Sequence, residues 1–310
     1  MSLRYSILGA GAMGSVFGAR LRLAGFEVEL LNRSPEHSEA IRAHGLQADI
    51  GEQRHTIAID ACTVEQAQAA DVVILFTKSH QIEAALQSMP DTLQRACVVT
   101  LQNGLGNGER VAQQVGRERT VEGVSMMPAE FIAPGKVASA DAARTWMYPL
   151  DDKLAELTQQ IGADFNQAGI TTEVTADVQS YIWQKACFNI AMNALCALTQ
   201  GSPGLLHAYE DGQLLAHELA DEALQVAALS HVAVDAAKVH ELIDYACANH
   251  TWHKPSMLQD LEANRLTEIE ALNGYIVRRA AELGMAVPGN QMILRLLRLR
   301  ERSPEFWEGK

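Results

Sequence analysis

The first half of the chain alternates short apolar runs with longer stretches of helical periodicity. The apolar runs cover residues 4–8, 27–31, 72–76 and 98–101, and the helical stretches cover residues 12–24, 35–44, 79–89 and 107–115. The runs are nearly continuous in Val, Ile and Leu, which is typical of strands buried on both faces. Buried strands separated by helices predict an α/β fold whose parallel sheet is covered on both sides.

Weaker strand patterns surround this framework. The segments LQADI (46–50) and RHTIAI (54–59) look like a small antiparallel insertion. Beyond residue 120, further strands are predicted at KVASA (136–140), RTWMYPL (144–150) and TTEVT (171–175), with a helix near residues 152–168.

From Asp177 onward the pattern changes to long helical periods with almost no strand signal. These periods cover residues 178–199, 213–230, 236–249, 256–283 and 290–301. The change predicts two domains, an N-terminal Rossmann-like dinucleotide-binding domain over residues 1–175 and an all-helical substrate or catalytic domain over residues 176–310. No low-complexity linker separates them, so we expect the domains to pack closely and form a cleft.

The charge balance narrows the classes of partner. With 38 acidic and 25 basic residues, the formal charge of −13 repels nucleic acid and anionic membranes. No apolar run is long enough to span a bilayer. The N-terminal segment superficially resembles a signal peptide, but a glycine motif at residues 9–14 explains its small and apolar residues better. We therefore expect a cytoplasmic protein with no nucleic-acid and no membrane partner.

The spacing of the cysteines and histidines indicates neither a disulfide framework nor a metal site. The five cysteines form no CxxC pair and are odd in number, so free thiols in a reducing compartment are expected. The ten histidines are scattered, and His250 and His253 lack further ligands at the usual spacing. The sequence therefore predicts no metal site.

A glycine motif follows the first predicted strand and opens the first helix. The segment Gly9-Ala10-Gly11-Ala12-Met13-Gly14 is a GxGxxG. In such a motif the first glycine permits a tight turn, the second lets the backbone approach a pyrophosphate, and the third lets helix and strand pack closely. The helix N-terminus offers its free N–H groups to the phosphates. The context of strand, turn and helix predicts dinucleotide binding.

The end of the second strand favours NADP(H) over NAD(H). An NAD site usually has an acidic residue about 20 positions beyond the motif, where this chain has Asn32 and Arg33. A guanidinium can grip a 2′-phosphate that a carboxylate would repel. Two further strand ends carry Thr77 and Lys78, and Gln102 and Asn103. Because ligands of such sheets lie beyond the carboxyl ends of the strands, contact with the cofactor is expected there.

Two lines of polar residues occur in the predicted helical domain. Lys185, Asn189 and Asn193 are four residues apart in an otherwise apolar helix, so they share one face. Ser256, Asp260, Asn264 and Glu268 repeat the same spacing in the helix predicted over 256–283.

Three of these residues also have a structural explanation. Ser256 and Gln259 match a capping box, Glu268 could be a solvated partner of Arg265, and Lys185 could extend its stem to the surface. Taken together they favour a site, because a lysine among aliphatic residues needs a partner such as a carboxylate on a neighbouring helix.

The chain resembles the ketopantoate reductases (2-dehydropantoate 2-reductases) over nearly its whole length. The resemblance rests on ILGAGAMG, TKSHQ, QNGLG, WQKACFNIAMNAL, PSMLQDLEANRLTEIEALNGYIV and GMAVPGNQ. It implies an NADPH-dependent reduction of 2-dehydropantoate to (R)-pantoate, a step toward pantothenate and coenzyme A. The family's catalytic lysine matches Lys185 as general acid, and its glutamate matches Glu268, which orients or charge-balances that lysine.

The resemblance also implies binding roles for other residues. Asn103, Asn189, Asn193 and Ser256 would hold the cofactor amide and the substrate, Arg33 and Lys78 would lie along the cofactor, and Asp260 near the substrate loop. The stretch VASADAARTWMYPLDD and the pair Lys254–Pro255 depart from the family pattern, so the exact substrate stays open. The alternatives are a reductase of another 2-oxo acid, an opine-type imine reductase, and a non-catalytic NADP(H)-sensing module. The oligomeric state also stays open, a homodimer included.

Overall fold

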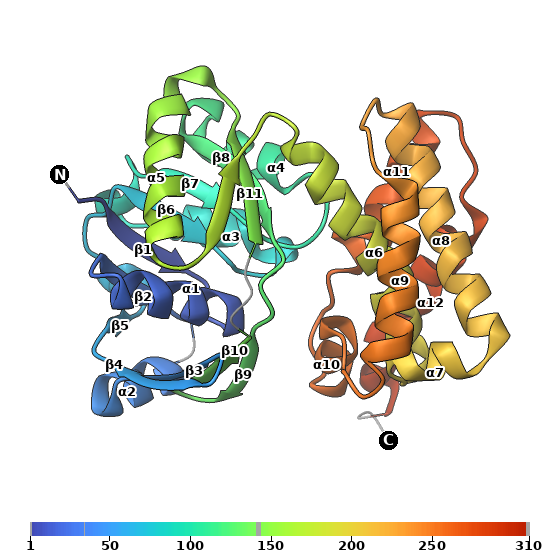
Figure 1. Cartoon of the computed structure of the whole chain (residues 1–310), viewed down its shortest axis with the longest axis horizontal. Helices are drawn as coiled ribbons and strands as arrows, with labels where there is room; N and C mark the ends of the chain where they lie inside the picture. The colour runs from blue at the N-terminus through green and yellow to red at the C-terminus, as the bar shows by residue number, and fades with distance from the viewer. Residues whose placement is uncertain (1, 34, 141–143, 308–310) are drawn as a thin grey trace. The chain divides into compact units, whose positions relative to one another are not determined.

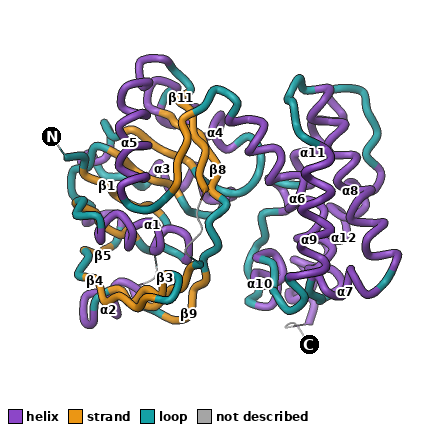
Figure 2. Tube along the Cα trace, viewed as in Figure 1, coloured by secondary structure: helices purple, strands orange, loops and turns teal. Residues whose placement is uncertain are grey.

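The structure of the chain is a computed structural model that describes residues 2–33, 35–140 and 144–307. The chain folds into two compact units (Figure 1). Unit 1 comprises Met1–Gln102 and Asn107–Val178, and unit 2 comprises Asn103–Gly106 and Gln179–Lys310. The predicted fold class is confirmed, since unit 1 is a mixed α/β unit and unit 2 is helical (Figure 2).

Unit 1 is built on an eight-stranded sheet of order β12-β11-β8-β7-β6-β1-β2-β5. Its strands are β1 (Arg4–Leu8), β2 (Glu27–Leu31), β5 (Asp60–Cys62), β6 (Val72–Leu75), β7 (Cys97–Thr100), β8 (Thr120–Ser125), β11 (Arg144–Pro149) and β12 (Thr171–Val174). These neighbours run parallel except for β8 and β11, which are antiparallel. The strand order reverses between β1 and β6, which is where such sheets bind dinucleotides.

Helices cover both faces of the sheet, as the continuous apolar strands predict. They are α1 (Ala12–Leu23), α3 (Ile82–Gln87), α4 (Asn107–Val115) and α5 (Ala155–Gln167). Neighbouring residues of one strand face opposite cores, because side chains alternate along a strand. Ile7 packs with Phe17 of α1 and Phe165 of α5, whereas Leu8 belongs to the core that contains Ile82 of α3.

A second sheet of order β4-β3-β10-β9 also belongs to unit 1. Its strands are β3 (Leu46–Ile50), β4 (Gln53–Ile57), β9 (Glu130–Ala133) and β10 (Lys136–Ser139), and α2 (Pro35–His44) precedes them. The predicted antiparallel insertion is confirmed as the β3–β4 hairpin, and β10 adds to β3 in parallel. Of the stretch that departs from the family pattern, residues 141–143 lie outside the described residues.

Unit 2 packs its helices around one apolar core. They are α6 (Val178–Thr199), α7 (Pro203–Ala208), α8 (Glu210–Leu229), α9 (Ala236–Asn249), α10 (Ser256–Glu262), α11 (Asn273–Glu282) and α12 (Pro288–Trp307), with a short 3-10 helix, η6 (Ile269–Ala271). From α6, Cys187, Ile190 and Ala194 are completely buried in this core. Within the part of the chain that the structure describes, no helix could cross a membrane.

The prediction of one helix over residues 256–283 is wrong. Asn264 adopts a left-handed conformation with φ of 51° and ends α10. The N–H of Arg265 donates to the carbonyl of Asp260 at 2.8 Å, and the N–H of Asn264 donates to that of Leu261 at 3.1 Å. These two bonds form a Schellman motif, in which asparagine is the common substitute for glycine. Glu268 therefore does not continue the line of Ser256 and Asp260 along one helix.

The predicted capping box at the start of α10 does not form. The side-chain amide of Gln259 instead donates to the backbone carbonyl of Lys254 at 2.8 Å. Pro255 occupies the N-cap position and has no side-chain hydrogen-bonding group to offer. The Ser256 hydroxyl is thus not explained by the structural role that its spacing suggested.

Candidate active site

The glycine motif forms the turn between β1 and α1. Gly9 has φ of +98°, and a Cβ there would lie 2.5 Å from the backbone nitrogen of Thr77. A Cβ at Gly14 would lie 2.5 Å from the carbonyl oxygen of Gly9. The expected tight turn and close helix packing are therefore confirmed. A Cβ at Gly11 would meet no described atom within 4 Å beyond its chain neighbours, so the turn is open at this point.

Gln102 ties together two strand ends beside this turn. Its amide nitrogen donates to the carbonyl oxygen of Thr77 at 2.6 Å, and its amide oxygen accepts from the Thr100 hydroxyl at 2.9 Å. The ends of β6 and β7 are thus fixed to each other at the carboxyl edge of the sheet. Lys78 follows Thr77 as the N-cap residue of a short 3-10 helix over Ser79–Gln81 and is partly buried.

A buried histidine that the sequence analysis missed supports the glycine turn. The N–H of Gly135 donates to Nδ1 of His37 at 2.9 Å, and Nε2 of His37 lies 3.0 Å from the Ser15 hydroxyl. That hydroxyl donates to the carbonyl of Ala10 at 3.1 Å. Because Nδ1 accepts, the hydrogen-bond network assigns the proton of the neutral ring to Nε2. Burial lowers the pKa of His37, which favours this neutral form.

The end of β2 carries the residues that favoured NADP(H). The side-chain amide of Asn32 donates to the Ser38 hydroxyl at 3.2 Å, and its backbone N–H donates to the backbone carbonyl of Cys62 at 3.0 Å. Asn32 therefore joins β2 to α2 and β5. Arg33 is exposed, with its side chain at the surface beyond the strand.

The line of polar residues on α6 lies largely out of solvent. Asn189 and Asn193 are each 8% exposed, and Lys185 is partly buried. Burial lowers the pKa of Lys185 to about 8, and the carboxylate of Glu268 acts in the opposite direction and raises it. The structure thus brings Lys185 and Glu268 into electrostatic interaction within unit 2, as the sequence predicts.

Glu268 is held by the segment that connects α10 to α11. It is 7% exposed, so the alternative of a solvated surface residue is excluded. The preceding Thr267 is fixed by Glu301 of α12, whose carboxylate accepts from its N–H at 2.8 Å and from its hydroxyl at 2.6 Å. Arg265, the suggested partner of Glu268, instead pairs with Asp260 at 3.1 Å.

The loop that contains Asn103 belongs to the helical unit. The N–H of Leu105 donates to the carbonyl of Ala271 at 2.8 Å. Gly104 has φ of +100°, and a Cβ there would lie 2.6 Å from the Cβ of Ala271. Only glycine allows this approach, which anchors the Asn103 loop to η6, whose N-cap is Glu268.

Asp260 and Ser256 lie on α10. Asp260 is 2% exposed, and its carboxylate accepts from the guanidinium of Arg265. This ion pair gives Asp260 a structural task in addition to the substrate contact expected from the sequence. Ser256 is partly buried in the first turn of the helix.

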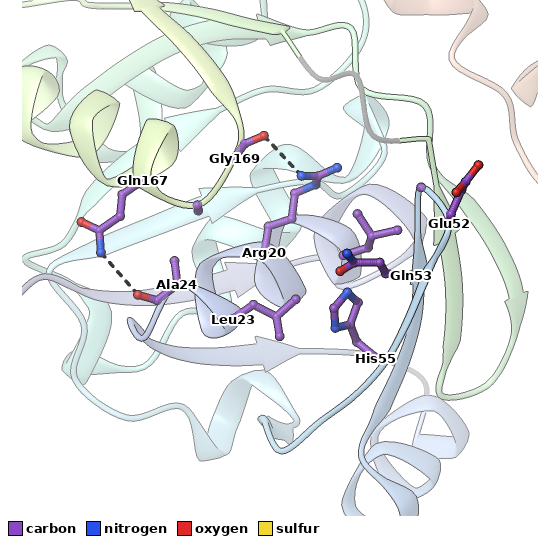
Figure 3. Close-up of a pocket in the computed structure, with 11 residues that line it drawn as sticks. Arg20, Leu23, Ala24, Glu52, Gln53, His55, Gln167 and Gly169 are labelled. Carbon is purple, nitrogen blue, oxygen red and sulfur yellow. Dashed lines mark hydrogen bonds between the residues drawn. The ribbon is translucent and has the colours of Figure 1, made fainter.

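A separate pocket of about 640 Å³ lies in unit 1 between α1, the β3–β4 hairpin and the end of α5 (Figure 3). The guanidinium of Arg20 points toward Gly169 and donates to its carbonyl at 3.2 Å. Glu52 and His55 line the pocket from the hairpin. None of the predicted site residues is among those that line it.

The strand order and the glycine turn at its reversal point define a dinucleotide-binding fold, and the partly buried Lys185 beside Glu268 adds a candidate acid. Residues 5–152 match the family "Ketopantoate reductase PanE/ApbA", and residues 177–301 match its C-terminal counterpart. The chain therefore belongs to the ketopantoate reductase family, as the sequence motifs predict.

Individual relatives agree with this assignment. A 2-dehydropantoate 2-reductase of Streptococcus pyogenes is 30% identical over 298 residues, which are 95% of this chain and 97% of the relative. A PanE/ApbA family ketopantoate reductase from Ralstonia eutropha has a similar structure, with a TM-score of 0.89, 30% identity and coverage of 98% and 100%. D-mandelate dehydrogenase in a ternary structure with NADH and anilino(oxo)acetate has a TM-score of 0.91, 28% identity and coverage of 97% and 99%.

Proposed function

We propose that the protein reduces 2-dehydropantoate to (R)-pantoate with NADPH and that Lys185 is the general acid. The observation that carries this proposal is the position of Lys185, whose pKa burial lowers to about 8 beside a buried glutamate. A lysine that is partly desolvated and close to neutral pKa is suited to giving up a proton during turnover. Membership of the ketopantoate reductase family supports a 2-oxo acid as the substrate class.

The residues of the glycine turn fit a dinucleotide. Gly11 leaves the turn open, and the first N–H groups of α1 have no partner within the helix, so they can bind a pyrophosphate. We assign Gly9, Ala10, Gly11, Ala12, Met13 and Gly14 to this contact, with Lys78 and Asn103 farther along the cofactor. Arg33 would bind the 2′-phosphate that distinguishes NADPH from NADH.

NADPH bound at the glycine turn would supply a hydride for C2 of the oxo acid, and residues of the chain would stabilise the resulting charge. As negative charge builds on the carbonyl oxygen, the ammonium of Lys185 stabilises it and then donates a proton from Nζ. The negative charge of Glu268 raises the pKa of Lys185 and so favours its ammonium form. Asn189 and Asn193 donate hydrogen bonds to the substrate without adding charge, and Ser256 binds its carboxylate, with Asp260 shaping the same region.

A second candidate is the reduction of a different 2-oxo acid. It is favoured by the close structural similarity to D-mandelate dehydrogenase, whose substrate class carries an aromatic ring in place of the branched hydroxylated chain. A non-catalytic sensor is less favoured, because a sensor has no use for a partly buried lysine with a lowered pKa beside a glutamate. An imine substrate of the opine type would use the same acid and therefore stays an alternative.

Steady-state rates decide between these candidates. The assay compares 2-dehydropantoate with the 2-oxo acid of mandelate and with unbranched 2-oxo acids, each with NADPH and with NADH. We expect kcat/KM to be highest for 2-dehydropantoate with NADPH. A higher value for an aromatic 2-oxo acid would establish the second candidate, and no turnover of any 2-oxo acid would refute both.

We further propose that the protein works in the cytoplasm, where thiols stay reduced. All five cysteines are free, and burial raises the pKa of Cys187 to about 12. Such thiols pack as small apolar side chains and have no disulfide to form. A homodimer is a further assembly that size measurements in solution can test.

A further inference from the structure

Helices α8 and α9 carry the same pair of residues at the same spacing. His217 and Asp221 lie four residues apart on α8, and His240 and Asp244 lie four residues apart on α9. The pairs cross between the helices: Nε2 of His217 lies 2.9 Å from Asp244, and Nε2 of His240 lies 3.0 Å from Asp221. The two remaining ring nitrogens, both Nδ1, lie 2.5 Å from each other. We call this arrangement the histidine pair.

The partners of the histidine pair orient its two rings. Each Nε2 faces a carboxylate oxygen, to which its N–H donates. The Nδ1 atom of each neutral ring then carries a lone pair, and the two Nδ1 atoms face each other between ring centroids 4.7 Å apart. The pair therefore directs two ring nitrogens toward one point, with a carboxylate behind each ring.

We propose that the histidine pair is a binding site for a divalent transition-metal ion such as Zn²⁺, Ni²⁺ or Cu²⁺, with Nδ1 of His217 and Nδ1 of His240 as ligands. The metal would lie where the two Nδ1 atoms face each other. Imidazole nitrogen is a preferred ligand of these ions. In metal sites the other ring nitrogen usually donates to a carboxylate, which fixes the ring and raises its basicity, and both rings already have this partner.

Charge and access favour metal binding at the histidine pair. A divalent ion balances the negative charges of the two carboxylates. The side chains of His217 and His240 are 28% and 30% exposed, so water can complete the coordination. Two nitrogens bound at about 2.1 Å to a tetrahedral ion lie roughly 3.4 Å apart, so the rings must separate slightly.

The proposed site would bind a metal ion reversibly, unlike a structural metal site that holds its ion permanently. Within the described residues no group of three or more His, Cys, Asp and Glu side chains could hold a metal ion. Affinity therefore depends on two imidazoles and is weaker than that of a structural zinc site with four protein ligands. Both ligands lie on helices with fixed positions, which reduces the ordering cost of binding.

Calorimetric titration of the full chain with Zn²⁺ tests the proposal without cofactor or substrate. We expect one binding site per chain. His217→Gln and His240→Gln should each weaken binding at least tenfold. Asp244→Asn should weaken it about tenfold or more, since it removes the carboxylate that orients His217.

The matched control is His207→Gln, an exposed histidine of α7 that hydrogen-bonds Gln213. This variant should bind Zn²⁺ as the original chain does. Zn²⁺ should also raise Tm of the original chain and of the control but not of the double variant His217→Gln/His240→Gln. Equal Zn²⁺ affinity in the double variant and the original chain would overturn the proposal, and so would the absence of binding by the original chain.

Discussion

At the scale of single residues, the proposed chemistry depends on how readily Lys185 gives up its proton. An exposed lysine has a pKa near 10.4 and is a poor acid at neutral pH. Burial lowers the pKa of Lys185 to about 8, while Glu268 prevents a larger fall. The side chain is thus still mostly protonated at neutral pH but is a stronger acid than an exposed lysine, as the proposed role of proton donor requires.

Replacing this lysine should remove turnover without removing the cofactor. For Lys185→Ala we expect kcat to fall about 10²- to 10⁴-fold, the usual contribution of a general acid. Titration of NADPH fluorescence should show an affinity within a few-fold of the original, because the glycine turn belongs to unit 1 and Lys185 to unit 2. The exposed Lys254, paired with Glu262, is the matched control. Unchanged turnover in Lys185→Ala would refute the assigned role.

The pH profile should carry the signature of the same group. A general acid must be protonated, so kcat/KM should be constant below the pKa of Lys185 and fall as pH rises through about 8. Glu268→Gln removes the charge that raises this pKa, so the alkaline limb should move to lower pH. A limb that stays in place in Glu268→Gln would show that another group controls the profile.

Sequence spacing predicts residues that share one element better than residues joined across the fold. Lys185, Asn189 and Asn193 were visible as a line because one helix carries them. His37 was not visible, because its partners Ser15 and Gly135 are distant in sequence. No local pattern marks such a residue, since only the folded chain makes its contacts.

At the scale of elements, two glycines of the same turn have different tasks. Gly11 leaves room for a ligand, whereas Gly14 leaves room for the helix to pack against the preceding backbone. Gly14→Ala should destabilise unit 1 by about 2 kcal/mol or more in urea unfolding, because the new Cβ meets backbone that cannot move aside. Gly11→Ala should leave stability nearly unchanged and weaken NADPH binding, since its Cβ enters the open side of the turn. Equal loss of stability in both variants would contradict this division.

The elements also show where sequence patterns mislead. The helix predicted over 256–283 keeps its period of four through Asn264, yet the chain turns there. Periodicity reports which residues could share a face, whereas the left-handed Asn264 and its Schellman bonds decide where the helix stops. The available signal for the helix end was Asn264, followed by Arg265, because asparagine can adopt the left-handed conformation that ends a helix. Short strands such as β5 were missed because three residues carry no measurable period.

At the scale of the whole molecule, long-range contacts assign segments to units in ways that the sequence does not indicate. Asn103–Gly106 lies in the first half of the chain but belongs to the helical unit, where Leu105 bonds to Ala271. The repeated His and Asp spacing of α8 and α9 is likewise uninformative until packing brings His217 and His240 together. The sequence predicts the alternation of strands and helices well because that alternation is local.

Stability of the folded chain should fall in acid, and His37 should be one cause. Burial lowers its pKa in the folded chain below the usual 6.5, so the unfolded chain binds more protons as pH decreases. The free energy of unfolding should therefore decrease from about pH 6.5 downward, until the lowered pKa is reached. Protonation at Nδ1 would also break the bond from Gly135.

His37→Gln tests this contribution, because a glutamine can keep both hydrogen bonds and has no proton to gain. Urea unfolding of this variant, followed by probes in unit 1, should show a weaker dependence on pH below about 6.5 than the original chain. His80→Gln removes an exposed histidine and should keep the original dependence. If His37→Gln and the original chain lose stability equally in acid, the buried imidazole is not a source of the acid sensitivity, and the carboxylates must account for it.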